Sequence, residues 1–277
     1  MRGKLAVYTL VLGCVGGFVF GASQGSIVIM LAVPAAAVAI VLGVAAYLAD
    51  SRAAKNFYLS FAETAGLEYV GNSDVLPYTP LLGAGDRQHC ENWMTGDVVR
   101  EPRLSGALGH FIYEEVKEST GSNGSRHEQT VERNRITVCM VDMEESILLY
   151  KGVFLRQHRG LLNLRRDWLA ATPSRRLEVE SSAFTHKYEL RMSTDQDEIL
   201  LRRLFSPTLV NWLAEHPLSP GFELRGGTLV VFVPRPLEDG GNLTFLLDAT
   251  REIAGRVLHE VRESIDRIAP NAKIAGL

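Results

Sequence analysis

The first 50 residues contain two apolar stretches that are separated by a short polar link. Residues 5–22 and 27–49 have no charged side chain, and only Ser23-Gln24-Gly25-Ser26 lies between them. At a rise of about 1.5 Å per residue, a helix over each stretch is nearly long enough to cross a hydrocarbon core of about 30 Å. The pattern therefore predicts a transmembrane helical hairpin over residues 1–49, with spans at about 5–22 and 27–49.

The basic residues around these stretches predict an orientation. Arg2 and Lys4 precede the first stretch, Arg52 and Lys55 follow the second, and the link contains no basic residue. Lys and Arg favour the cytoplasmic side of a membrane, so both ends of the hairpin are expected there. The predicted location is the inner (plasma) membrane, as a multi-pass protein with a cytoplasmic domain. An alternative is that the first stretch is a cleaved signal peptide, although its apolar run is long for one.

Small residues recur every fourth position in both stretches. They are Gly13, Gly17 and Gly21 in the first, and Ala35, Ala39 and Gly43 in the second. Such faces allow two helix backbones to approach closely in lipid. They predict packing within one hairpin or self-association of several hairpins. Neither stretch contains an ionisable side chain, which favours an anchor over a transporter.

The pattern changes after Asp50. Residues 50–66 continue at helical spacing and predict a juxtamembrane helix, whereas residues 71–103 are rich in Gly, Pro and Asp and predict long loops with short elements. Residues 107–116 and 129–141 have strand character and flank a polar tip, which predicts a β-hairpin. Further strand signals follow at residues 148–154, 160–163, 176–180 and 184–192. Residues 222–233 predict two strands joined in a hairpin at Gly226-Gly227.

Helical signals come late in the chain. Asp195, with Glu198 three residues later, predicts one helix start, and Ser206 before Pro207 predicts another. An apolar stripe from Leu246 predicts a long last helix that ends before Pro270. Hairpin-paired strands with helices inserted late predict an α+β class. Residues 67–277 are thus expected to form a cytoplasmic antiparallel-sheet domain with a long C-terminal helix.

Composition and charge exclude some classes of partner. The chain is 46% apolar and 22% charged, as expected for a globular protein. Arg2 and Lys4 are the only charged residues before Asp50, so the rest has 27 of the 29 basic residues and all 32 acidic ones, a net charge of about −5. A mildly acidic domain is a poor candidate for nucleic-acid binding. Three cysteines without a paired motif indicate reduced, partly buried thiols.

No sequence motif indicates catalysis, a cofactor or a metal. The seven histidines form no HExxH pattern, no serine lies in GxSxG, and Gly83-Ala-Gly85 lacks the Lys of a phosphate loop. One local basic cluster is the candidate interaction patch: Arg156, His158, Arg159, Arg165 and Arg166. This cluster is either a solvated surface or a contact for anionic lipid headgroups or an acidic partner.

One stretch of the chain resembles a known family. Its residues are Tyr150-Lys-Gly-Val-Phe154, Leu177-Glu-Val-Glu-Ser-Ser-Ala-Phe184, Tyr188 to Gln196, Leu204-Phe-Ser-Pro-Thr-Leu209 and Phe222 to Phe232. Their order resembles the bacterial DUF3137 family of uncharacterised membrane proteins. The match departs from the pattern at Tyr188, where Phe is expected, and at Phe205-Ser206-Pro207, where Leu-Thr-Pro is usual. The resemblance implies two N-terminal spans and a cytoplasmic domain, and it carries no catalytic residue.

The function predicted from these observations is a membrane-tethered, non-catalytic interaction or regulatory domain. Its partners would be the lipid bilayer, an unidentified protein and further copies of the hairpin, and not nucleic acid. The alternative is a small-ligand sensor or an unrecognised enzyme with a pocket near residues 71–103. A channel would require oligomerisation through the glycine face.

Overall fold

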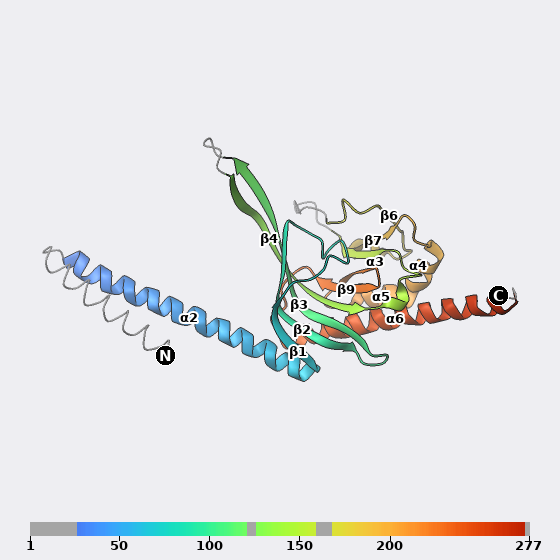
Figure 1. Ribbon diagram of the computed structural model, residues 1–277, viewed down its shortest axis with the longest axis horizontal. Helices are drawn as coiled ribbons and strands as arrows, with labels where there is room; N and C mark the ends of the chain where they lie inside the picture. The colour runs from blue at the N-terminus through green and yellow to red at the C-terminus, as the bar shows by residue number, and fades with distance from the viewer. Residues whose placement is uncertain (1–26, 121–125, 159–167, 275–277) are drawn as a thin grey trace. The chain divides into compact units, whose positions relative to one another are not determined.

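The computed structural model describes residues 27–120, 126–158 and 168–274. Its internal contacts divide the chain into two units, residues 1–60 and residues 61–277. The second unit contains the sheet and most of the helices, and it positions every site discussed below (Figure 1).

The N-terminal part of the described chain is one helix, α2 (Ile27–Ala65). It continues without a break through Asp50, Arg52 and Lys55 and ends before Gly66, which has a φ of 75° and is a typical helix C-terminal residue. In the described residues no helix combines the length and the apolar character that a membrane crossing requires.

This finding corrects the prediction of a transmembrane hairpin, and with it the predicted multi-pass location in the inner membrane. The apolar residues 27–49 form the first part of α2, which continues through the charged segment to Ala65. The first predicted span, residues 5–22, lies outside the described residues.

The second unit is built on a sheet in which every neighbouring pair of strands is antiparallel. The strands are β1 (Leu67–Ser73), β2 (Arg87–Val99), β3 (Leu104–Thr120), β4 (Arg126–Asp142), β5 (Val153–Gln157), β6 (Ser174–Arg176), β7 (Tyr188–Ser193), β8 (Gly221–Arg225) and β9 (Thr228–Val233). Their order is β1-β2-β3-β4-β9-β8-β5-β7-β6. The sheet and a long C-terminal helix agree with the sequence.

Two of the hairpins follow from local sequence. Strands β3 and β4 pair as far as Thr120 and Arg126, and their hairpin extends beyond the other strands (Figure 1). Strands β8 and β9 are joined at Gly226 and Gly227, whose φ values of 59° and 77° suit the tight turn that a right-handed twist favours.

Five helical segments follow β4 in the described residues. They are η1 (Glu144–Ser146), α3 (Ser182–Lys187), α4 (Glu198–Leu204), α5 (Pro207–Glu215) and α6 (Gly240–Ile274). Helix α5 has Pro207 at its start as predicted. Helix α4 is capped by Asp197, whose carboxylate accepts from the N–H of Ile199 at 2.8 Å, and not by Asp195 as predicted. Helix α6 continues through Pro270.

The two faces of the sheet are covered differently. Alternate residues of β4 point to opposite faces. Cys139 lies on the face that packs against α6, beside Thr250. Val138 and Met140 face the other way, into a cluster with Leu81 and Leu82 from the segment between β1 and β2. The segment 74–86 therefore covers the face opposite α6.

Candidate functional site

The predicted basic patch is only partly described, and one of its members is buried. The side chain of Arg156, on β5, is 9% exposed, and its Nε and Nη2 donate to Glu189 Oε2 at 3.0 and 2.7 Å. Burial raises the pKa of Glu189, but hydrogen bonds and charge from Arg156 and Arg191 lower it overall. His158 is exposed at the end of the strand. The other members lie outside the described residues: Arg159, Arg165 and Arg166. The patch stays a prediction, without Arg156 as a solvent-facing member.

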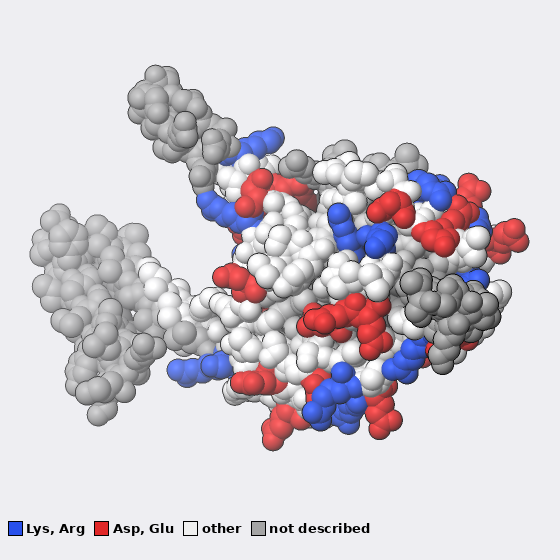
Figure 2. Space-filling model, turned by 45° about the vertical axis from the view of Figure 1, so that its right-hand side comes forward, with Lys and Arg blue, Asp and Glu red and all other residues white. Residues whose placement is uncertain are grey.

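The wider surface has no strong separation of charge in the face shown in Figure 2. Acidic and basic side chains alternate over the described residues there. Among the described residues, some acidic and basic side chains form pairs along a helix, such as Glu252 with Arg256 at 2.7 Å and Glu263 with Arg267 at 2.6 Å. Such exposed pairs each contribute little to the free energy of folding.

The residues predicted to pack helices in a membrane are also only partly described. Three lie outside the described residues: Gly13, Gly17 and Gly21. Ala35 lies in α2, but its side chain is not described. Ala39 and Gly43 are exposed, and a Cβ placed on Gly43 would have no described atom within 4 Å. The described structure therefore shows no packing partner for this face.

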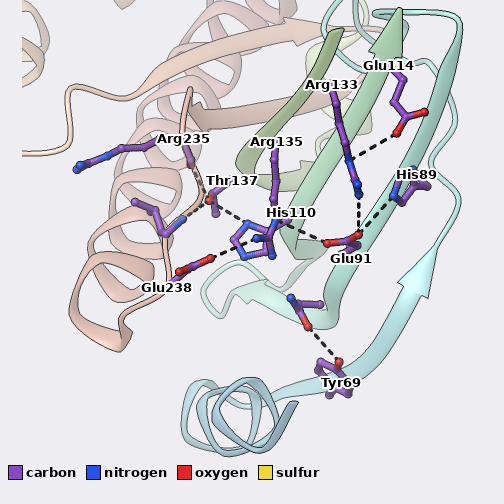
Figure 3. A network of polar contacts seen from close by, with 12 residues as sticks. Tyr69, His89, Glu91, His110, Glu114, Arg133, Arg135, Thr137, Arg235 and Glu238 are labelled. Atoms are coloured by element: carbon purple, nitrogen blue, oxygen red, sulfur yellow. Dashed lines mark hydrogen bonds and ion pairs between the residues drawn. The ribbon is translucent and has the colours of Figure 1, made fainter. Parts of the chain in front are cut away.

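A network of ion pairs crosses β2, β3 and β4 on the face that also carries α6 (Figure 3). Glu91 is its centre and lies 3.2 Å from Arg133 Nη2 and 3.6 Å from Arg135 Nε. Each arginine also reaches a second carboxylate, Arg133 at Glu114 and Arg135 at Glu238. The sheet thus brings together charges that are far apart in sequence, and it pairs them with one another.

A buried histidine lies at the base of this network. Thr137 Oγ1 donates to the backbone oxygen of Arg235 at 3.0 Å and accepts from the N–H of Leu237 at 2.8 Å. Because that hydroxyl has one proton, His110 Nδ1 must donate to it across their 3.2 Å separation. Burial, assisted by the charge of Arg135, lowers the pKa of His110 to about 3. His110 is therefore neutral at physiological pH.

This network fixes structure and does not form a reactive centre. His110 has no exposed surface, so a substrate does not reach it. Glu91 is shared among several cations, with His89 Nε2 also 3.5 Å away. Among the described residues no group of three possible metal ligands is found. The contacts instead hold the residues before α6 to the middle of the sheet.

The two described cysteines are also unsuited to chemistry. Cys90 and Cys139 are free thiols with no exposed surface. Burial raises the pKa of both to about 12, and at Cys90 the charge of Asp74 adds to this effect. Because the thiolate is the reactive form, neither is a nucleophile at neutral pH.

A groove of about 450 Å³ lies on the opposite face of the sheet, and part of its lining comes from the region 71–103 that the sequence marks as irregular. Its floor consists of three buried side chains: Trp93, Ala107 and Met140. One wall is the segment 74–78, where Leu76 is 62% exposed and Tyr78 is 47% exposed. We call this site the 74–78 groove.

The 74–78 groove has an acidic lining. Asp74, Asp97 and Asp142 all line it. Asp97 accepts from Nε of Arg103 at 2.9 Å, but Arg103 is 81% exposed, so water screens this pair strongly. Burial, together with the negative charge of Glu144, raises the pKa of Asp142. The groove thus combines apolar surface with an excess of negative charge.

A buried carboxylate holds the segment that continues from this wall. Glu223, on β8, is 1% exposed and accepts from the backbone N–H of Leu81 at 2.9 Å and from Trp168 Nε1 at 2.8 Å. The buried Thr79 hydroxyl adjoins the same carboxyl. Burial raises the pKa of Glu223, and this effect outweighs the hydrogen bonds and the charge of Arg156, which lower the pKa. Glu223 therefore positions residues 79–82, immediately after the groove wall.

Comparison with known proteins adds no assignment. No protein-family model matches the chain, and no curated protein matches it. One solved structure, the mycobacterial trehalose monomycolate transport factor A, TtfA, has 14% sequence identity and a TM-score of 0.46, over 74% of this chain and 95% of that chain. Similarity at this level establishes neither a shared fold nor a shared function. The resemblance to the DUF3137 family stays a prediction.

The sequence suggested a pocket near residues 71–103 as an alternative, and it did not indicate the residues that form the groove. The available signal for the groove was the presence of two apolar residues, Leu76 and Tyr78, in a Gly- and Pro-rich segment. Asp142 could not be connected with them, because it enters the groove from β4, more than 60 positions later in the chain.

Proposed function

We propose that the sheet unit is a non-catalytic interaction domain that binds a short segment of a protein partner in the 74–78 groove. The observation that carries this proposal is the pair of exposed apolar side chains, Leu76 and Tyr78, above a buried apolar floor. Exposed apolar surface at a concave site is typical of an interface, and tyrosine is enriched in interfaces. Covering this surface would remove it from water and so favour binding.

The lining of the groove supports binding over turnover. Its described side chains include hydroxyls and carboxylates but no imidazole, amine or thiol. Ser105 therefore has none of the bases that commonly activate a serine nucleophile. Binding requires only surface and charge, which the groove supplies.

A second candidate is the binding of a small ligand. The volume of about 450 Å³ falls within the range of small-molecule sites. A peptide is favoured because Leu76 and Tyr78 lie on an exposed segment instead of enclosing a cavity. Thermal-shift screening with small metabolites separates the two, since a small ligand would raise the melting temperature without any peptide.

Selection from a random peptide library on the full chain tests the main proposal. We expect enriched peptides that lose binding about tenfold when Tyr78→Ser removes an aromatic contact. The matched control is Leu148→Ser, because Leu148 is also an exposed apolar residue but does not line the groove. Enriched peptides that bind the Tyr78→Ser protein as well as the unmodified protein, or no enrichment at all, would contradict the proposal.

A further inference from the structure

The charge of the 74–78 groove points to the chemistry of its occupant. Asp74 and Asp142 are both exposed and line the groove, and no ion pair of either is seen among the described residues. In the part of the chain that the structure describes, the ion-pair partner of Asp97 is the exposed Arg103. On the basis of the function proposed above, we infer that the groove binds a segment with a Lys or Arg side chain next to an apolar residue.

Electrostatic complementarity supports a cationic side chain. Carboxylates at both sides of one groove attract a cation and repel an anion, and this effect selects partners more than it strengthens binding. Glu144 lies close enough to Asp142 for the two negative charges to interact. A bound ammonium or guanidinium group would offset that repulsion.

The apolar part of the groove supports the neighbouring residue. Tyr78 is 47% exposed, so its ring can stack on a guanidinium group or cover an aliphatic stem. Leu76 and the floor residue Met140 can cover an adjacent apolar side chain. A phosphate-rich partner such as RNA would face the same three carboxylates and is disfavoured.

Three pools of short, fluorescently labelled peptides test the inference on the full chain. The pools are random except for a fixed central residue, which is arginine, citrulline or glutamate. Citrulline keeps the shape of arginine and removes its charge. From the value of exposed ion pairs, the arginine pool should bind about two- to fivefold more tightly than the citrulline pool for each carboxylate engaged, and the glutamate pool most weakly.

Substitutions in the groove locate the effect. Asp74→Asn and Asp142→Asn should each reduce the preference for arginine about two- to fivefold. Raising the ionic strength from about 0.05 to 0.5 M should reduce this preference further. Asp266→Asn is the matched control, since Asp266 is exposed on α6 and does not line the groove. It should leave the preference unchanged.

The outcomes separate the two proposals. A preference for arginine that depends on Asp74 and Asp142 supports the inference. Equal binding of all pools that still requires Tyr78 overturns the inference but leaves the interaction function intact. Binding that does not require Tyr78, or no binding by any pool, overturns both.

Discussion

Replacing Glu223 with glutamine should loosen the segment that continues from the groove wall. Both carboxylate oxygens of Glu223 accept from groups that can only donate, the backbone N–H of Leu81 at 2.9 Å and Nε1 of Trp168 at 2.8 Å. A glutamine has one oxygen, so its NH₂ group must face one of these donors. The variant therefore loses a hydrogen bond and leaves a buried N–H unpaired.

The size of the effect follows from burial. Glu223 is 1% exposed, so water cannot replace the lost contact. An unsatisfied buried polar group costs about 1–3 kcal/mol. A loss of that size lowers the melting temperature by about 2–4 °C for each kcal/mol in a domain of this size. Peptide binding in the 74–78 groove should weaken as well, because Leu81 is anchored three residues after Tyr78.

The effect should also depend on pH. Burial raises the pKa of Glu223, so the folded state holds the proton more tightly than the unfolded state does. Its contribution to stability is then fully present below about pH 4.5 and is lost as the pH rises through the raised pKa. The penalty for Glu223→Gln should therefore be larger at pH 4.5 than at neutral pH.

Urea unfolding followed by tryptophan fluorescence measures this penalty. Glu145→Gln is the control, because Glu145 is exposed and its replacement should change the free energy of unfolding by less than about 0.5 kcal/mol. A Glu223→Gln protein as stable as the unmodified protein at both pH values would refute the reasoning.

Four further single substitutions test other parts of the structure. Gly106→Ala should destabilise the domain by about 2 kcal/mol or more, since the added Cβ would overlap a backbone carbonyl of β4. Gly255→Ala should instead stabilise α6 by about 0.5–1 kcal/mol, because no described atom obstructs the added Cβ. Chemical denaturation measures the free energy of unfolding of both variants. Because the pKa of His110 is lower in the folded state, the unmodified protein should lose stability as the pH falls from about 6.5 towards 3, by at most about 1.4 kcal/mol per pH unit. His110→Asn should remove this loss. Equal slopes of unfolding free energy against pH in the two proteins would contradict the prediction. Arg156→Ala should cost about 1–3 kcal/mol, because the partly buried Glu189 loses its closest cation and keeps Arg191 at 3.1 Å. A double variant in which Arg156 and Glu189 both become Met should recover most of that loss.

The sequence predicted several strands of the sheet but was wrong at residues 184–187, where it predicted a strand and the structure has helix α3. It also failed along β2, where the backbone departs from regular geometry. The long strand β2 falls in the segment 71–103, for which the sequence predicted long loops with short elements. Its register shifts between Glu91 and Met94, where Asn92 has a φ of 52°, and again between Asp97 and Val99. Bulges of this kind interrupt the alternation of apolar and polar residues from which strands are recognised.

The same limit applies to the candidate site. Arg156 belongs to a basic cluster in sequence, but β5 pairs with β7 so that its side chain meets Glu189. The carboxylates of the 74–78 groove come from separate segments, and only the tertiary structure brings Asp74, Asp97 and Asp142 to the lining of one groove. Spacing along the chain does not predict such meetings.

The sequence by itself determined the antiparallel class, the β3–β4 and β8–β9 hairpins, the start of α5 at Pro207 and the long final helix, because each depends on periodicity or on turn residues a few positions apart. Apolarity alone predicted two membrane spans, a prediction that the described helices do not support. The tertiary structure decided the bulged strand β2, the burial of Arg156, the pairing of Glu223 with Leu81 and Trp168, and the groove. These features depend on contacts between residues distant in sequence, and hydrophobic periodicity contains no information about which distant residues will meet.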